Sequence, residues 1–566
     1  MDDYYDLGTH SRQVSTSVSD AQMWFDRGLV WSYAFNHDEA AACFSTAIEN
    51  DPSCAMAYWG LAYALGPNYN KPWEFFDEAE LTTTVARTHK AVEDAVAAVD
   101  ENNTDAERSL IAALRHRYPA ATPEMNADAD PPWVIWNADY ADAMREVHRT
   151  HPDDLDVATL FADALMNLTP WELWDLRTGE PAPGSHALEA KDVLDRALES
   201  GDGRRHPGIL HMYIHLMEMS AVPEQALVVA DRLRGLVPDA GHLQHMPTHL
   251  DVLCGDYRRV VSSNSDAIDA DEKFLAREGS MNFYTLYRAH NFHFKIYGAM
   301  LLGQSAVAID TATALEAAIP EELLRVDSPP MADWLEGFLA MRVHVYIRFG
   351  RWQDIIDLDM PSDQDLYCVT TAMMHYAKGV ASSATSQIEH AERESELFEE
   401  AVARVAPSRT LFNNTCLDIL AIAAAMLEGE LEYRKGNYDR AFDALRRSIE
   451  LDDGLPYDEP WGWMQPTRHA YGALLLEQGH VEDAAAVYRA DLGLDATLPR
   501  ALQHPFNVWA LHGYHECLLS LGRTDEAAII GQQLALAVAM ADVPVESSCF
   551  CRTSSAPAAE QHCCSE

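Results

Sequence analysis

Eight of the 24 histidines in this 566-residue chain fall within one segment of 88 residues, about twice the number that an even distribution would place there. Imidazole is a common ligand of transition metals, and it exchanges protons near neutral pH. The segment is therefore the part of the sequence best suited to metal chemistry or proton transfer. Its histidines are His206, His211, His215, His242, His245, His249, His290 and His293.

The spacing of these histidines places several of them together on helix faces. His211, His215 and Glu218 stand at i, i+4 and i+7, which lie on one face of a helix. His245 and His249 repeat the i, i+4 spacing, and a third pair follows at i, i+3. Adjacent helices that each supply two ligands form a common type of metal site. The predicted ligands are His211, His215, Glu218, His245, His249, His290 and His293, with Glu218 a further ligand or an orienting residue.

The donor set narrows the choice of metal. Nitrogen-rich sites suit copper, zinc, nickel and iron, whereas calcium and magnesium prefer oxygen ligands. Six imidazoles exceed what one four-coordinate ion uses, so a dinuclear centre is expected, and three histidines per ion favour a copper pair, with iron or zinc as alternatives. A hydrogen-bonded polar core is the competing interpretation. No glycine-rich nucleotide-binding motif occurs, which predicts no nucleotide cofactor.

Amphipathic helices joined by short turns must position these residues. A unit of glycine, three residues and an apolar-faced helix recurs, and its spacings of 43 to 48 residues, or twice 43, indicate stacked helix pairs. The glycine is expected where a Cβ would crowd the turn. In the first repeat, helices are expected over 25–35, 39–48 and 55–65. The sequence thus predicts an all-α solenoid of tetratricopeptide-like pairs around a concave cleft. The recurring glycines are Gly255, Gly303, Gly350, Gly436, Gly479 and Gly522.

Composition shifts divide the chain into five predicted segments. Proline- and glycine-rich loops at 118–133, 178–187 and 452–466 interrupt the repeats. The segments are a flexible acidic N-terminus (1–19), N-terminal repeats (20–200), histidine-rich repeats (201–300), C-terminal repeats (301–543) and a disordered cysteine-containing tail (544–566).

The motifs around the histidines resemble a large family of bacterial and fungal tetratricopeptide-repeat proteins. The resemblance rests on His206-Pro-Gly through Glu218, on Ala240-Gly-His-Leu-Gln-His-Met-Pro-Thr-His249, and on flanking motifs at 33–40, 57–68, 290–294 and 459–468. It covers about residues 20 to 540 and implies a fold and a site rather than a reaction. It implies that the six paired histidines belong together. It also implies that His37, Glu39 and Arg468 face the same cavity.

Further residues are candidates for roles near the metal. Trp461, in the 452–466 loop, either covers the cleft or wedges the loop between repeats. Tyr213 and His206 are candidate proton-transfer residues. For His37, an ordinary helix–helix turn is an equally good interpretation.

Charge and targeting signals limit the possible partners. Lys and Arg number 41 against 89 Asp and Glu, so the net charge is −48, which disfavours nucleic acid and anionic membranes. No signal peptide or membrane-spanning run is found, and the scattered cysteines fit a reducing cytoplasm. We therefore expect a metal-dependent oxidoreductase acting on a small organic substrate. The alternatives are a scaffold that binds a protein partner through its repeat surface, and a metal-binding chaperone.

Overall fold

The computed structural model describes residues 4–123, 125 and 130–553. Within these residues the regular secondary structure is helical apart from one short antiparallel ladder and two isolated bridges, which confirms the predicted all-α class. The chain divides into two compact units. Unit 1 comprises Met1–Asp251, Ser263–Asn291 and Val326–Pro330, and unit 2 comprises Val252–Ser262, Phe292–Arg325 and Met331–Glu566. This division differs from the boundaries expected near residues 200 and 300.

Unit 1 is built from the first eleven α-helices and the adjoining parts of the next three. Consecutive helices such as α1 and α2, α3 and α4, and α5 and α6 pack against each other as pairs. The elements are α1 (Ser19–Tyr33), α2 (His37–Asn50), α3 (Ala55–Leu65), η1 (Trp73–Phe75), α4 (Glu78–Ala98), α5 (Asp105–Arg117), α6 (Pro132–Thr150), α7 (Leu155–Met166), α8 (Ala187–Glu199), η2 (Gly203–Arg205), α9 (Pro207–Glu218), η3 (Pro223–Ala226), α10 (Leu227–Leu233) and α11 (Gly241–His245).

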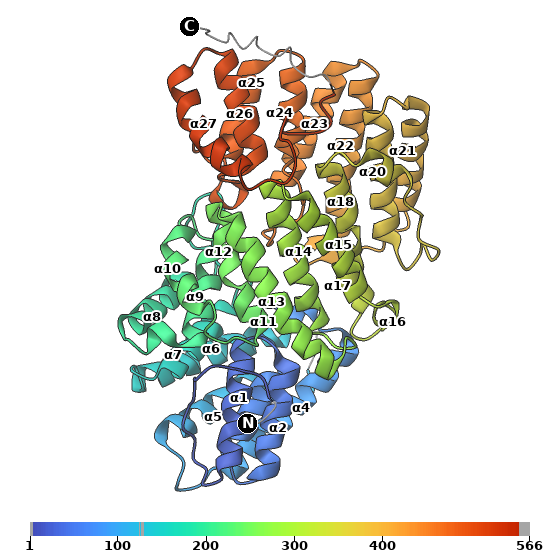
Figure 1. Cartoon of the computed structure of the whole chain (residues 1–566). Coiled ribbons are helices and arrows are strands. Elements are labelled where there is room, and N and C mark those ends of the chain that lie inside the picture. The colour runs from blue at the N-terminus through green and yellow to red at the C-terminus, as the bar shows by residue number, and fades with distance from the viewer. Residues whose placement is uncertain (1–3, 124, 126–129, 554–566) are drawn as a thin grey trace. The chain divides into compact units, whose positions relative to one another are not determined.

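The boundaries between the units fall within α12 (Pro247–Cys254), α13 (Tyr257–Glu278) and α14 (Thr285–Leu302). Unit 2 continues with helix pairs, among them α20 with α21 and α22 with α23, which lie side by side in Figure 1. Its remaining elements are α15 (Ser305–Ala318), α16 (Glu321–Leu324), α17 (Met331–Leu335), η4 (Glu336–Ala340), α18 (Met341–Arg348), α19 (Trp352–Ile356), α20 (Cys368–Ala384), α21 (Ile388–Val402), β1 (Thr410–Leu411), β2 (Asn414–Thr415), α22 (Cys416–Arg434), α23 (Tyr438–Asp453), α24 (Thr467–Glu477), α25 (Val481–Asp491), η5 (Arg500–Leu502), α26 (Val508–Ser520) and α27 (Thr524–Val538).

The turns within helix pairs share a left-handed residue. In three pairs of unit 2 this residue is Gly436, Gly479 or Gly522, each with positive φ. Among the described residues, no atom lies within 4 Å of where a Cβ would stand at these three positions. At these three turns glycine is therefore favoured by its φ and not by crowding, whereas at Gly255, Gly303 and Gly350 a Cβ would lie within 3.0 Å of a neighbouring atom, as expected. Between α1 and α2 the equivalent residue is Phe35, with φ of 55°.

The segment expected to be a flexible N-terminus is bonded to unit 1 from Tyr4 onward. Leu7 is buried, the Asp6 N–H donates to the carboxylate of Asp239 at 2.8 Å, and the Asp239 N–H donates to the Asp6 carbonyl at 3.0 Å, just before α11. The guanidinium of Arg12 donates to the carboxylate of Asp154 at 2.7 and 2.9 Å. These contacts connect the N-terminal segment to the helices that carry the histidines.

The first part of the predicted C-terminal tail packs on unit 2. Ser548 is buried, accepts a hydrogen bond from Arg348 through its carbonyl, and donates to the carbonyl of His469. Cys549 and Cys551 are joined by a disulfide. The rest of the tail, with Cys563 and Cys564, lies outside the described residues.

Candidate metal centre

Helix α9 carries the first two candidate ligands, His211 and His215. It begins with Pro207 at its first position, where a missing N–H is tolerated, and the side chain of His206 accepts a hydrogen bond from Ile209 N at 3.3 Å. Every residue of α9 is buried. His211 and His215 lie one helical turn apart on it, so their rings extend from the same face.

A nearly continuous helical path carries three more histidines. His242 and His245 lie in α11 and His249 lies in α12. Met246, between the two helices, keeps helical dihedrals (φ −49°, ψ −39°), and Pro247 takes the first position of α12. The three histidines thus stand at i, i+3 and i+7 on one helical face. His245 is the last residue of α11.

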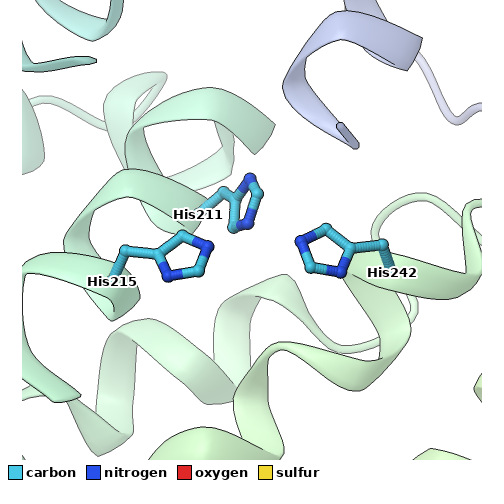
Figure 2. A group of neighbouring side chains, drawn as sticks. All are labelled: His211, His215 and His242. Carbon is cyan, nitrogen blue, oxygen red and sulfur yellow. The ribbon is translucent and has the colours of Figure 1, made fainter. Parts of the chain in front are cut away.

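The first triad consists of His211, His215 and His242, whose ligand atoms all lie within 4.8 Å of one another. Figure 2 shows two rings from one helix and the third from another, all directed toward a common point. The Nδ1 of His211 donates to the backbone carbonyl of Tyr33 at 2.6 Å, and the Nδ1 of His215 donates to Glu218 at 2.9 Å. Both Nε2 atoms lack a hydrogen-bond partner among the described residues, as do both ring nitrogens of His242. The triad therefore presents unused imidazole lone pairs to a shared centre.

The second triad consists of His245, His249 and His290, with the same 4.8 Å limit between ligand atoms. The Nδ1 of His245 lies 2.7 Å from Asn264 Oδ1, and the Nδ1 of His249 lies 2.8 Å from Glu218 Oε2. The Nε2 atoms of these two histidines are 2.7 Å apart. When both Nδ1 atoms carry the proton, two Nε2 lone pairs face each other, and a cation between them removes their repulsion.

The proton on His245 Nδ1 follows from its neighbours. Thr248 donates its hydroxyl proton to the His245 carbonyl at 2.7 Å, so its oxygen accepts from Asn264 Nδ2 at 3.2 Å. That contact turns the amide oxygen of Asn264 toward the imidazole. Because an amide oxygen only accepts, His245 donates from Nδ1 and leaves Nε2 as the ligand atom.

Glu218 connects the two triads. One carboxylate oxygen contacts His215 of the first triad and the other contacts His249 of the second. The ring centroids of these two histidines are 5.8 Å apart, and those of His242 and His245 are 6.0 Å apart. The contacts at Nδ1 support the orienting role considered for Glu218, since a carboxylate that accepts from Nδ1 directs Nε2 toward a metal. His215, Glu218 and His249 also form a compact group of possible metal ligands.

Burial keeps the imidazoles neutral, which is the form that binds metal. Loss of solvent lowers the pKa of His211 to about 3 and that of His245 to about 4. Burial, together with the neighbouring imidazoles, also holds the pKa values of His215, His242 and His249 well below the ordinary value. The triads are therefore buried groups of neutral nitrogen donors that can hold metal ions.

The structure places three other predicted site residues in different surroundings. His293 belongs to unit 2, where its ring lies near those of Phe338 and Phe412. The hydroxyl of Tyr213 donates to Asp195 of α8 at 2.9 Å. His206 contacts Asp156 at 3.0 Å. Within the described part of the chain, none of the three predicted residues is a member of either triad.

The predicted cleft residues also separate. His37 lines a cavity in unit 1, whereas the side chain of Glu39 binds Tyr4 and Cys43. Two further residues lie in unit 2 and bond to consecutive acids. These pairs are Trp461 with Asp452 and Arg468 with Asp453.

The sequence interpretation did not include His242 among the candidate ligands, although the structure groups it with His211 and His215. A signal was present, because His242 precedes His245 by three residues and therefore shares its helix face. The spacing of His242, His245 and His249 mirrors that of His211, His215 and Glu218 read in reverse. Reading helical spacing across the proline would have added His242 to the predicted ligands.

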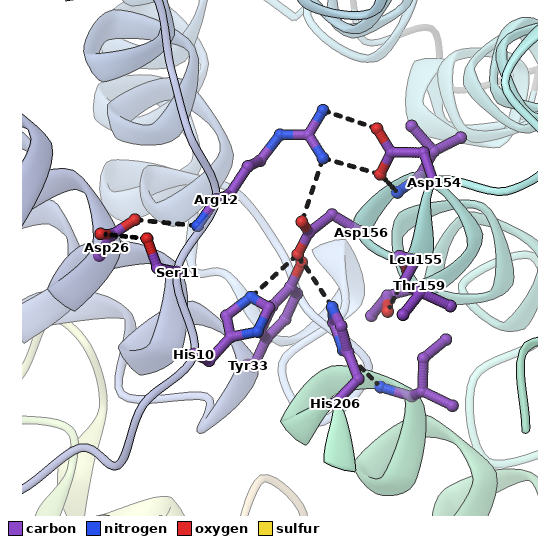
Figure 3. Close-up of polar contacts among 12 residues, drawn as sticks. His10, Ser11, Arg12, Asp26, Tyr33, Asp154, Leu155, Asp156, Thr159 and His206 are labelled. Atoms are coloured by element: carbon purple, nitrogen blue, oxygen red, sulfur yellow. Dashed lines mark hydrogen bonds and ion pairs between the residues drawn. The ribbon is translucent and has the colours of Figure 1, made fainter. Parts of the chain in front are cut away.

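A third buried cluster surrounds Asp156 (Figure 3). Its carboxylate accepts hydrogen bonds from the hydroxyl of Tyr33 at 2.6 Å and from Arg12 at 3.0 Å. His10 at 3.1 Å and His206 at 3.0 Å complete the group. Burial raises the pKa of Asp156, but the contacts with the two histidines outweigh it and hold the pKa well below the ordinary value.

Comparison with known proteins identifies the repeat. A tetratricopeptide-repeat model matches residues 33–65, which span α2 and α3. The chain therefore contains a tetratricopeptide repeat, and its helices form the paired, solenoid-type arrangement of such proteins. Curated proteins give no match.

Comparison with solved structures gives matches of low similarity. The APC/C hetero-tetramer Cut9–Hcn1 is 13% identical, with 85% of this chain and 74% of that chain covered and a TM-score of 0.30. Naa15/Naa10 bound to HypK-THB is 13% identical, with coverages of 91% and 70% and a TM-score of 0.20. These similarities are too weak to support a functional conclusion. None of the described helices has the length and hydrophobicity needed to cross a membrane.

Proposed function

We propose that the two triads bind a pair of transition-metal ions, one per triad, and that the chain is a metal-dependent oxidoreductase acting on a small organic substrate. The observation that carries the proposal is the 2.7 Å approach of His245 Nε2 to His249 Nε2, with both Nδ1 atoms directed at acceptors. The first triad repeats the pattern with two buried Nε2 atoms that make no hydrogen bond within the described residues.

An unoccupied triad is energetically unfavourable. Each buried polar nitrogen without a partner costs about 1–3 kcal/mol, and the first triad directs at least three toward one point. A hydrogen-bonded polar core, the competing interpretation, would pair these atoms. Coordination satisfies them together, so the arrangement favours metal binding.

The donor set favours copper, with iron and zinc as alternatives. Each triad offers three neutral imidazoles, and the single carboxylate nearby, Glu218, faces Nδ1 atoms. A copper pair bound there would supply two one-electron redox centres. The protein's own residues hold the ring orientations, through Tyr33, Asn264 and Glu218, and bury the site away from water.

Metal analysis of the full-length protein tests the proposal. Inductively coupled plasma mass spectrometry should find about two equivalents of metal in the wild type. The double variant His211→Ala/His249→Ala, with one ligand removed from each triad, should lose most of it. A matched variant, His186→Ala/His390→Ala, changes two exposed histidines and should retain the metal.

Activity follows from the same preparations. The metal-loaded wild type and the matched variant should consume dioxygen in the presence of an organic reductant, and the triad double variant should not. A folded wild type that binds no copper, iron or zinc after reconstitution would overturn the proposal and favour the interaction scaffold.

A further inference from the structure

A cavity of about 410 Å³ lies in unit 1 beside the first triad. Phe35 and Tyr287 belong to its lining and also contact the triad. The Phe35 ring lies 4.5 Å from that of His211, 5.6 Å from that of His215 and 5.5 Å from that of His242, measured between centroids. The Tyr287 ring lies 5.0 Å from that of His242. These two aromatic residues separate the cavity from the first triad.

Phe35 holds this place through an unusual backbone conformation. Its φ of 55° lies in the left-handed region, at a turn position that three helix pairs of unit 2 fill with glycine. Such a conformation costs about 1–2 kcal/mol for a residue with a side chain and is more common at functional sites. A glycine would form the same turn but would leave no ring between the cavity and the histidines.

Polar groups gather at the same end of the cavity. Asn36 and His37 follow Phe35 directly, and both line the cavity. Asn36 Nδ2 is buried and makes no hydrogen bond with described residues. The His37 ring is buried near backbone groups at the end of α3, and the Tyr287 hydroxyl is buried near Asn68 and Asn70. The three side chains therefore bring polar atoms together beside Phe35, where a ligand can contact them.

The remaining walls favour an uncharged aromatic ligand. Phe76 and Phe283 line the cavity, and the ammonium of Lys71 lies 4.5 Å and 4.2 Å from their ring centroids. Lys71 is also paired with Glu80. The lining holds two acidic residues and two Lys or Arg residues, so it carries no formal charge although the whole chain carries −48.

We propose that this cavity binds an uncharged phenol, with its ring between the aromatic walls and its hydroxyl against Asn36, His37 and Tyr287. The volume lies in the lower part of the range for small-molecule sites, about 300–1,000 Å³, which fits one or two rings. This assignment rests on the proposed function, because it makes the cavity the substrate site and places the substrate beside the first triad.

Binding of 4-methylphenol to the full-length protein tests the inference. Calorimetry should be carried out on copper-loaded protein and on protein stripped with a chelator. Ala41 lines the cavity, and Ala41→Trp should fill it and weaken binding at least tenfold. The neighbouring Ala42 is exposed and does not line it, so Ala42→Trp should change the affinity less than twofold.

A second variant tests recognition of the hydroxyl. His37→Phe keeps an aromatic ring but removes its polar atoms, so it should weaken 4-methylphenol about fivefold and leave toluene unchanged. If Ala41→Trp does not fold, as judged by circular dichroism, Ala79→Trp replaces it, since Ala79 also lines the cavity.

The outcomes separate the two proposals. Protein that retains metal but shows no phenol binding sensitive to Ala41→Trp would overturn the cavity assignment and leave the metal centre. Protein that binds phenol in this cavity but retains no metal would overturn the metal centre and leave the binding site. Equal losses in Ala41→Trp and Ala42→Trp would also overturn the cavity assignment.

Discussion

The two triads and the Asp156 cluster are groups of histidines in the same unit, yet they use their polar atoms differently. Around Asp156, the carboxylate is the centre and accepts from Arg12, Tyr33, His10 and His206 at 2.6–3.1 Å (Figure 3). In the first triad, three imidazoles surround the centre, and the Nε2 atoms of His211 and His215 and both ring nitrogens of His242 have no hydrogen-bond partner among the described residues (Figure 2).

The difference shows that residue type alone does not define a metal site. Both groups contain histidines and a carboxylate within ligand distance of one another. The guanidinium of Arg12 already supplies a positive charge to Asp156, so a metal ion would be repelled there. Convergent atoms that remain unsatisfied are the better criterion.

Removal of Asp156 should give the largest effect on stability. Asp156→Ala removes the shared acceptor of Tyr33, His10 and His206, while Arg12 keeps its two hydrogen bonds to Asp154. Each buried donor left without an acceptor costs about 1–3 kcal/mol, so the summed loss is about 3 kcal/mol or more. We expect urea unfolding to show a loss of this size. Metal content per folded molecule should stay at the wild-type level.

The converse variant is His245→Ala. It should remove metal from the second triad while costing the metal-free protein much less stability than Asp156→Ala. Loss of metal in Asp156→Ala, with His245→Ala retaining it, would reverse the assignment of the two regions.

Glu218→Gln should weaken metal binding at both triads. The amide keeps the shape of the side chain, but its single oxygen can accept a hydrogen bond from only one of His215 and His249, so the other ring loses its orientation. Loss of such an orienting partner lowers metal affinity about 10- to 100-fold. Competition with a chelator of known affinity measures the change. An unchanged affinity at both triads would contradict the orienting role.

Much of this arrangement could be predicted from the sequence, because it follows local rules. Helices expected over 25–35, 39–48 and 55–65 correspond to α1, α2 and α3, since apolar spacing and turn residues are local signals. The close approach of His211 to His215, and of His245 to His249, follows from helical spacing. These pairs lie 4.7 Å apart between ring centroids.

The other features of the site depend on tertiary structure and could not be predicted from the sequence. His290 and His293 share a helix, yet the division between the units falls after Asn291, and His293 is placed with the phenylalanines of unit 2. Backbone groups leave no sequence signal, so the Tyr33 carbonyl that fixes the tautomer of His211 could not be foreseen. Nor could the position of Phe35, where the turn geometry favours glycine.

His344 in unit 2 sharpens the comparison, because its Nδ1 is buried without a hydrogen-bond partner among the described residues, yet it belongs to none of the groups of possible metal ligands found there. Burial lowers its pKa to about 3. The unfolded chain takes up a proton near pH 6.5 and the folded protein does not, so stability is complete above this pH and falls as the pH decreases. Between pH 6.5 and 5.5, this histidine should cost the wild type about 1 kcal/mol.

The variant His344→Phe keeps an aromatic ring but cannot take up a proton. Between pH 6.5 and 5.5, its free energy of unfolding should therefore fall by about 1 kcal/mol less than that of the wild type. The carboxyl of Asp156 should not contribute over this pH interval. Because folding lowers its pKa, it changes the free energy of unfolding only as the pH falls below the unfolded value of about 3.9. Metal content should equal that of the wild type. A variant that lost metal would show that a solitary buried histidine participates in binding.

Thr248→Val should give the smallest effect, because it acts on the His245 ring mainly through the orientation of Asn264. Removal of the hydroxyl frees the Asn264 amide to turn its NH₂ toward His245 and so disfavours the tautomer with Nε2 as ligand. A single hydrogen bond of this kind contributes about 0.5–1 kcal/mol, which corresponds to a two- to fivefold loss of metal affinity. The measurement is made in a His211→Ala background, where the first triad lacks a ligand. Thr248→Ser keeps the hydroxyl and should restore the affinity, whereas equal losses in both variants would mean that packing, and not the orientation of Asn264, controls the second triad.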